Sequence, residues 1–323
     1  MVPTWIFALA ILVIVLGGAY GVRNQINGLL GFGGSAALGG VGAKPTIWWY
    51  VDDLQANTKE WVSFEDRATR EPTEPYLKLC LKKAHRLWSD EFTIVPVIGR
   101  RAALAHLKTA AVEIPEGADR CPPALWMAWV RCAFLAHLGG LWLDGSVLPM
   151  GSGVEMRRRL LNDSVLTFGA DADEELAAAA QDGSEGGPAA GRSAGWASVP
   201  GHPMWAGLAR DIGAVIQEGD QSWSSFEARR SLRFLWSKHC SGMTRVDRKA
   251  EVSRDAYGKR LNYEDLFEKT EWQNGSTKHG LWLPLPDGRD KLEMASPFLW
   301  FTRLSEAQIA ESDFLWAKFA KAN

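Results

Sequence analysis

The stretch that decides the fold reads LGGLWLDGSV and spans residues 138–147. Its two glycines can end a helix, because glycine readily adopts the left-handed conformation that follows a helical last turn. The apolar run at residues 141–143 is typical of a short strand that is buried on both faces. Asp144 then stands where that strand ends. Because ligands of open α/β sheets bind at the carboxyl ends of strands, we expect Asp144 to lie at a ligand site.

Strands and helices alternate on either side of this stretch. Apolar and periodic segments predict strands at 46–51, 92–98 and 164–168, and helices at 76–88, 102–111 and from Pro122 onward. Pro96 lies inside the second of these strands, which is typical of an edge strand. The alternation predicts an α/β, Rossmann-type layered domain with a mainly parallel central sheet. Later segments predict helices at 204–218 and 225–239, a strand at 298–302 and a closing helix at 306–322.

The N-terminal segment predicts a membrane anchor. Residues 5–22 are 18 consecutive residues without a charge, just enough for a transmembrane helix. A cleaved signal peptide is the rival interpretation, but no lysine or arginine precedes the apolar run. We therefore expect an anchor at 1–22 and a single-pass protein of an internal membrane such as the Golgi or the endoplasmic reticulum. Arg23 is thin evidence for orientation, so the side of the membrane stays open.

Two further segments have a composition of their own. Residues 23–45 contain repeated glycines and predict a flexible stem, which leaves residues 46–323 for the globular domain. Within that domain, residues 169–195 are rich in alanine, glycine, serine and acidic residues. We expect them to form a mobile acidic loop on the surface.

Composition narrows the classes of function. The net charge of −2 offers no basic field for nucleic acid, so we expect no nucleic-acid partner. The 16 tryptophans predict mainly packing, although indole faces also stack on sugars and bases. The four cysteines lack the spacing of a metal site and predict free buried thiols, with one or two disulfides as the alternative in an oxidising lumen; they are Cys80, Cys121, Cys132 and Cys240. No motif of P-loop proteins, serine hydrolases or zinc proteases occurs.

The order of these features resembles that of a known family. An opening strand with paired tryptophans at 48–49, a helix that carries Arg131 and a GG-aromatic-L-D strand are similar to glycosyltransferases with a DXD motif. The likeness is greatest to the capsular-polysaccharide-synthesis and α-mannosyltransferase-like family, and it covers about residues 46–210. The VPGHP stretch at 199–203 also resembles a downstream segment of such enzymes. The resemblance implies a GT-A fold, a nucleotide-sugar donor, a glycan or other acceptor, and retention of configuration.

The resemblance also implies which residues bind the donor. A divalent cation offsets the charge of a leaving diphosphate, and hard oxygen ligands favour Mn²⁺ or Mg²⁺. The diphosphate supplies several ligands itself, so one protein carboxylate can suffice. The expected metal ligands are Asp144 and His202, and the expected nucleotide-sugar-binding residues are Asp52, Asp53, Arg131, Gly139, Gly140 and Ser146. No catalytic residue is identified.

Structural roles compete with these assignments. Asp144 can instead cap the turn after its strand, Arg131 can form a structural ion pair, and His202 can belong to a turn. Two positions also depart from the family pattern: Ala128 stands where the helix usually carries an acid, and Ser146 replaces the second acid. An alternative is therefore a catalytically degenerate protein of the same fold, with a structural or sugar-binding role in a membrane-associated or viral assembly.

Overall fold

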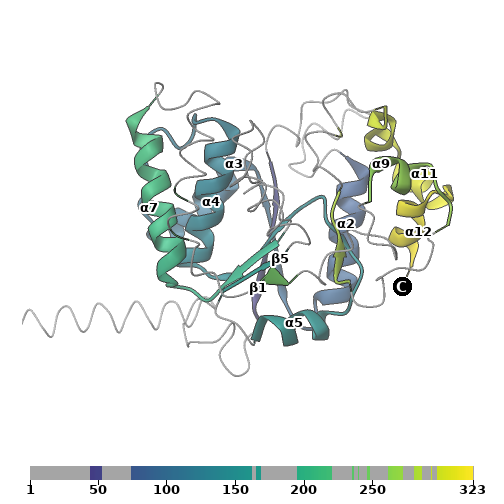
Figure 1. The fold of residues 1–323 in the computed structure, drawn as a ribbon, viewed down its shortest axis with the longest axis horizontal. Helices are drawn as coiled ribbons and strands as arrows, with labels where there is room; N and C mark the ends of the chain where they lie inside the picture. The colour runs from purple at the N-terminus through teal and green to yellow at the C-terminus, as the bar shows by residue number, and fades with distance from the viewer. Residues whose placement is uncertain are drawn as a thin grey trace, which may run out of the picture.

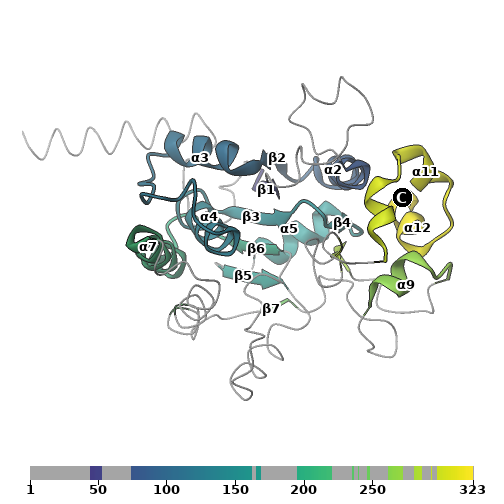
Figure 2. The same ribbon diagram turned by 90° about the horizontal axis from the view of Figure 1, so that it is seen from above.

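The central element of the computed structural model is a six-stranded sheet (Figures 1 and 2). The structure describes residues 44–52, 74–161, 165–168, 195–219, 261–271, 280–285 and 297–322, together with residues 235, 239, 246, 247 and 292. The strands lie in the order β2 (Thr93–Ile98), β1 (Thr46–Val51), β3 (Gly140–Asp144), β6 (Gly195–Ser198), β5 (Val165–Phe168) and β7 (Val246–Asp247). A second sheet pairs β4 (Leu148–Pro149) with β8 (Trp282–Leu283).

The predicted α/β fold with a mainly parallel sheet is confirmed. β1 is parallel to both β2 and β3, and β7 is parallel to β5. Only β6 runs the other way among these six strands, antiparallel to β3 and to β5. β2 is an edge strand, as its proline predicted. The chain places β2 on one side of β1 and β3 on the other, which creates a topological switch point between β1 and β3.

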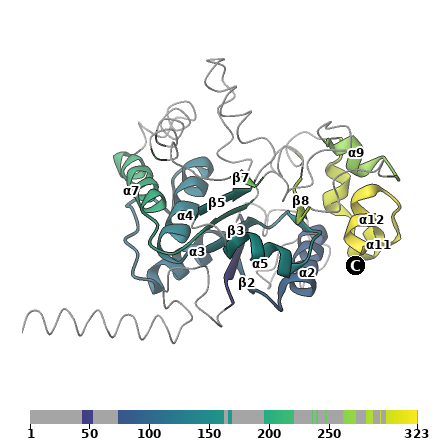
Figure 3. The same cartoon turned by 60° about the horizontal axis from the view of Figure 1, so that its bottom comes forward.

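Helices cover both faces of the sheet (Figure 1). One face carries α3 (Gly99–Thr109), α4 (Pro123–His137) and α7 (Pro203–Glu218). The other face carries α2 (Pro75–Trp88) and, beyond it, α9 (Tyr263–Phe267), α11 (Glu306–Glu311) and α12 (Leu315–Lys321). Figure 3 shows the last three grouped together at one end of the molecule. The sheet thus separates two hydrophobic cores.

Strand alternation assigns side chains to these two cores. In β1, Trp48 and Tyr50 face α3, α4 and α7, whereas Ile47, Trp49 and Val51 face α2. Ten of the eleven tryptophans in the described residues are buried, and only Trp300 is exposed. The prediction that tryptophan serves mainly in packing is therefore confirmed for this part of the chain. Cys80, Cys121 and Cys132 are buried free thiols, as predicted.

The C-terminal prediction was partly wrong. Residues 298–302 do not form a strand, because Leu299–Arg303 is a 3-10 helix, η5, that buries Phe301 against Phe267 and Tyr76. The expected single closing helix is two short helices, α11 and α12, with a break at 312–314. Lys83 of α2 donates to the carbonyl of Phe319 and holds α12 in place.

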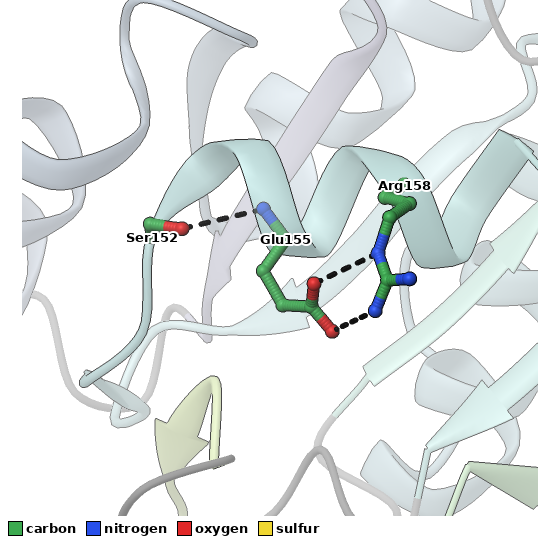
Figure 4. A network of polar contacts seen from close by, with 3 residues as sticks. All are labelled: Ser152, Glu155 and Arg158. Atoms are coloured by element: carbon green, nitrogen blue, oxygen red, sulfur yellow. Dashed lines mark hydrogen bonds and ion pairs between the residues drawn. The ribbon is translucent and has the colours of Figure 1, made fainter.

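α5 (Gly153–Leu161) lies at the amino edge of the sheet, where α2 ends. Its first turn is capped by the Ser152 hydroxyl, which accepts a hydrogen bond from the Glu155 backbone N–H at 3.3 Å (Figure 4). The Glu155 carboxylate then binds the Arg158 guanidinium through two contacts of 2.9 Å. Arg157 pairs with Glu91 at 2.8 Å. Arg157 and Arg158 of α5 therefore both form ion pairs with nearby glutamates.

Several predicted segments fall outside the described residues. They include the anchor at 5–22, nearly all of the stem at 23–45, residues 169–194 of the acidic loop, and most of the helix at 225–239. Gly195, the last residue of the predicted loop, belongs to β6. Within the described ranges, none of the helices combines the length and the apolar character needed to cross a membrane.

Candidate functional site

The structure places Asp52 and Asp144 at the carboxyl ends of neighbouring strands. Asp52 follows the last residue of β1, and Asp144 is the last residue of β3, in register with Tyr50. Side chains alternate along a strand, so Asp52 shares the face of Tyr50, and Asp144 shares the face of Trp142. Both carboxylates are half-buried and lie at the switch point between β1 and β3.

Asp144 is oriented by the turn that follows it. Its Oδ1 accepts a hydrogen bond from the backbone N–H of Ser146 at 2.8 Å and another from the Ser146 hydroxyl at 2.6 Å. Gly145 donates its N–H to the carbonyl of Tyr50 at 2.6 Å. A Cβ at Gly145 would lie 2.4 Å from Cγ2 of Val51, so only glycine fits at this position. Within the described ranges, Oδ2 of Asp144 accepts no hydrogen bond.

Tyr50 connects the Asp52 carboxylate to the neighbouring helix α4. Its hydroxyl accepts a hydrogen bond from Nε1 of Trp126 in α4 at 2.8 Å and donates to Oδ1 of Asp52 at 3.5 Å. Its ring stacks on Trp142 of β3, with centroids 4.8 Å apart. Sequence reasoning missed Tyr50 and Trp126. Strand alternation places Tyr50 on the Asp52 face, whereas Trp126 gives no such signal.

Arg131 supplies a buried positive charge near Asp144. It projects from α4, is 6 % exposed, and its guanidinium carbon lies 4.0 Å from the centre of the Trp196 ring. Burial lowers the pKa of Arg131, while Cys132, Asp144 and Tyr50 act in the opposite direction. Asp144 therefore stabilises the charged guanidinium across the site. Ala128, one turn earlier in α4, is half-buried and brings no carboxylate.

Gly139 and Gly140 lie at the other end of β3. Both have positive φ values, +65° and +92°, and a Cβ at Gly140 would lie 2.4 Å from the carbonyl oxygen of Thr46. The carbonyl of Gly139 accepts a hydrogen bond from Nε1 of Trp48 at 2.7 Å. These contacts join the end of α4 to the start of β3. At about 3.3 Å per residue, Gly140 lies about 13 Å from Asp144, so we leave both glycines out of the proposed donor site.

His202 also lies at that far end. It follows β6, whose last residue, Ser198, is in register with Gly140. Its Nδ1 accepts a hydrogen bond from the backbone N–H of Met204 at 3.3 Å, which makes His202 the N-cap of α7. Burial lowers the pKa of His202 and so favours the neutral form that can accept this bond. Metal–ligand bonds are about 2.0–2.6 Å long, so one ion cannot bind Asp144 and His202 together; the predicted pairing of these two ligands is wrong.

Asp144 is the candidate for the protein carboxylate that would bind a metal ion. Asp53 lies outside the described residues. Among the residues that the structure describes, no three histidine, cysteine or acidic side chains come together as a metal cage. A diphosphate can supply the other oxygen ligands, so Oδ2 of Asp144 is suited to a cation that arrives with its ligand. Asp52, Asp144, Arg131 and Ser146 are the predicted residues that the fold brings to one region.

No model of a known protein family matches the sequence, and no curated protein matches it either.

Proposed function

We propose that this chain binds a nucleotide sugar at the carboxyl ends of β1 and β3 and is a divalent-metal-dependent glycosyltransferase. One observation carries the proposal: Asp52 and Asp144 follow adjacent parallel strands at a switch point, on the face that also carries Arg131. Open α/β sheets bind ligands at such a place. The sequence resemblance to DXD-type glycosyltransferases adds the class of ligand.

Each group has a role suited to its chemistry. Oδ2 of Asp144 would hold Mn²⁺ or Mg²⁺ against the diphosphate, and the cation would offset the charge of the leaving group. Asp52 can accept hydrogen bonds from ribose hydroxyls. The buried positive charge of Arg131 interacts with the carboxylate of Asp144 and would offset part of its negative charge. In the reaction, the bond between the anomeric carbon and the diphosphate oxygen breaks, a bond to an acceptor hydroxyl oxygen forms, and the acceptor loses its proton. By resemblance, the configuration is retained.

A sugar-binding protein without transferase activity is the second candidate. One observation favours it over an enzyme. Ala128 leaves α4 without the carboxylate that the resemblance to the family would place there. Such a protein would bind the donor, or a glycan that resembles it, and release it unchanged.

Calorimetry on the full chain in detergent tests the proposal. Titration with UDP and GDP, with and without Mn²⁺, should show binding that depends on the metal. Asp144→Asn removes the charge but keeps an acceptor oxygen for Ser146. We therefore expect at least about a tenfold loss of affinity, equivalent to about 1.4 kcal/mol, with unchanged stability. Asp52→Asn should weaken binding less.

Asp90→Asn is the matched control, because Asp90 is exposed in the turn between α2 and β2, at the opposite edge of the sheet. It should leave nucleotide affinity unchanged. Absence of nucleotide binding at millimolar concentration, with or without Mn²⁺, would overturn the donor-binding proposal. Binding of nucleotide sugars without hydrolysis or transfer to any glycan acceptor would favour the second candidate.

We also propose that residues 5–22 anchor the chain in a membrane. The expected result is that the full chain stays with membranes during carbonate extraction, whereas a chain lacking residues 5–22 is released. Release of both chains would contradict the anchor.

A further inference from the structure

We infer that Ser146 is a positioning residue, which turns Asp144 so that only its Oδ2 reaches the ligand. The inference rests on the proposed function, because it says how the same site presents its carboxylate. It also revises the sequence-based expectation that Ser146 binds the donor directly. The hydroxyl proton of Ser146 is directed to Oδ1 of Asp144 at 2.6 Å, and the Ser146 backbone N–H is directed to the same oxygen at 2.8 Å.

Ser146 is held on its other side as well. It is 4 % exposed, and its carbonyl oxygen accepts a contact from the Cys80 thiol at 3.8 Å. The preceding Gly145 is fixed against β1 by its hydrogen bond to Tyr50 and by the lack of space for a Cβ. Because Ser146 is buried and is held by both Asp144 and Cys80, it is poorly placed to reach a sugar. It is well placed to fix the rotamer of its neighbour.

The arrangement leaves Asp144 one carboxylate oxygen, Oδ2, with which to bind a ligand. Two short hydrogen bonds occupy Oδ1, and charge-assisted bonds of this kind are among the stronger ones in proteins. Oδ2 accepts no hydrogen bond within the described ranges. The carboxylate can therefore bind a cation through Oδ2 without giving up its hydrogen bonds to the turn.

The inference predicts that a second acid would not improve this site. Ser146→Asp would restore the two acids of the motif that the sequence resembles. Here it would place a second negative charge within hydrogen-bonding distance of Oδ1 and remove the donor that orients Asp144. Like charges at this distance repel, so the carboxylate of Asp144 would turn away.

Three variants test the inference by calorimetry with Mn²⁺ and UDP. Ser146→Ala should weaken nucleotide binding about tenfold, Ser146→Thr should bind within about threefold of wild type, and Ser146→Asp should bind at least as weakly as Ser146→Ala. Ser152→Ala is the control, since the Ser152 hydroxyl likewise takes part in a local turn, where it accepts a hydrogen bond from the Glu155 backbone N–H at the start of α5 (Figure 4). It should leave binding unchanged. Urea unfolding of each variant shows whether the fold is retained.

Crystal structures of wild type and Ser146→Ala give a readout that needs no activity. The Asp144 carboxylate should keep one rotamer in wild type and lose it in the variant. An unmoved carboxylate in Ser146→Ala, or tighter binding in Ser146→Asp, would overturn the inference. If wild type binds no nucleotide, the proposed function fails, and the positioning role is then decided by the carboxylate rotamer alone.

Discussion

The two ends of β3 differ in how completely the surrounding protein contacts them. At the amino end, Gly139 and Gly140 allow helix, strand and loop to approach so closely that a Cβ would clash with backbone atoms. At the carboxyl end, Asp144 is half-buried and keeps one oxygen without a hydrogen bond among the described residues. The amino end is packed tightly by other parts of the protein, whereas the carboxyl end leaves a carboxylate oxygen that can accept a contact from a ligand.

The difference shows that residues of one contiguous motif can have separate roles, some structural and some in ligand binding. Residues 139–146 resemble one functional signature, yet the strand between the glycines and the acid separates them by about 13 Å. The glycines allow α4 to connect closely to the start of β3, the strand that ends at Asp144. Asp144, oriented by Ser146, is the residue of the motif that we propose binds the ligand.

The largest expected effect is at the amino end. Gly140→Ala would place a methyl group 2.4 Å from the Thr46 carbonyl oxygen at a φ of +92°. We expect the free energy of unfolding to fall by at least about 3 kcal/mol, from the clash and the strained backbone together. Urea denaturation measures it. Gly201→Ala is the control, because Gly201 also has a positive φ, +80°, but open space around it. Equal losses in the two variants would contradict the role of close packing.

A smaller effect is expected at the carboxyl end from Trp126→Phe. The change removes the donor to Tyr50 and leaves a small cavity, so stability should fall by about 2 kcal/mol. Nucleotide affinity should also fall, because Tyr50 and then Asp52 lose their orientation. Trp129→Phe removes the same volume from the same buried helix face and should change stability without changing affinity. If both variants lose affinity equally, Trp126 has no specific role in the site.

Variants of His202 distinguish a structural role of this side chain from a metal-binding role. His202→Ala should lower stability by about 1 kcal/mol through loss of the cap of α7, while His202→Asn, which can accept the same hydrogen bond, should restore most of it. Neither variant should change Mn²⁺-dependent nucleotide binding, because His202 lies at the opposite edge from Asp144. A loss of metal dependence in His202→Asn would place the histidine in the site after all.

The smallest effect is a dependence of stability on pH. Burial lowers the pKa of His202 below its ordinary value of 6.5, so the unfolded chain binds more protons at this group than the folded chain does. The stabilising contribution of His202 is present above pH 6.5 and is lost as the pH falls below that value. Melting temperatures of wild type and His202→Asn should therefore diverge between pH 6.5 and 5, with wild type falling faster. Parallel curves would contradict a neutral capping histidine.

Much of the fold was predictable from the sequence, because long periodic segments carry their own signal. The strand at 46–51 and the helix at 204–218 lie where apolar periodicity placed them. β6 was missed, because GWAS is short and contains three small residues. η5 was mistaken for a strand, since burial of Phe298 and Phe301 by distant aromatic residues leaves no local periodicity.

The site was predictable only where strand ends carry acids. Asp52 and Asp144 could be placed at one edge from the strand pattern alone. His202 could not, because its position depends on β6 running antiparallel to β3, and nothing in four residues reveals strand direction. The orientation of Ser146 toward Asp144 is a matter of rotamers, which a motif does not encode.

The hairpin formed by β5 and β6 has a consequence for how this chain can change. Phe168 and Gly195 are paired, and Gly195 also pairs with Leu143, the residue before Asp144. Any sequence joining Phe168 to Gly195 thus begins and ends beside the proposed site, and each doubling of such an insert costs only about 0.6 kcal/mol in closure entropy. The length and sequence of the joining segment can therefore change at a small cost in stability, while the paired strands that flank it stay the same.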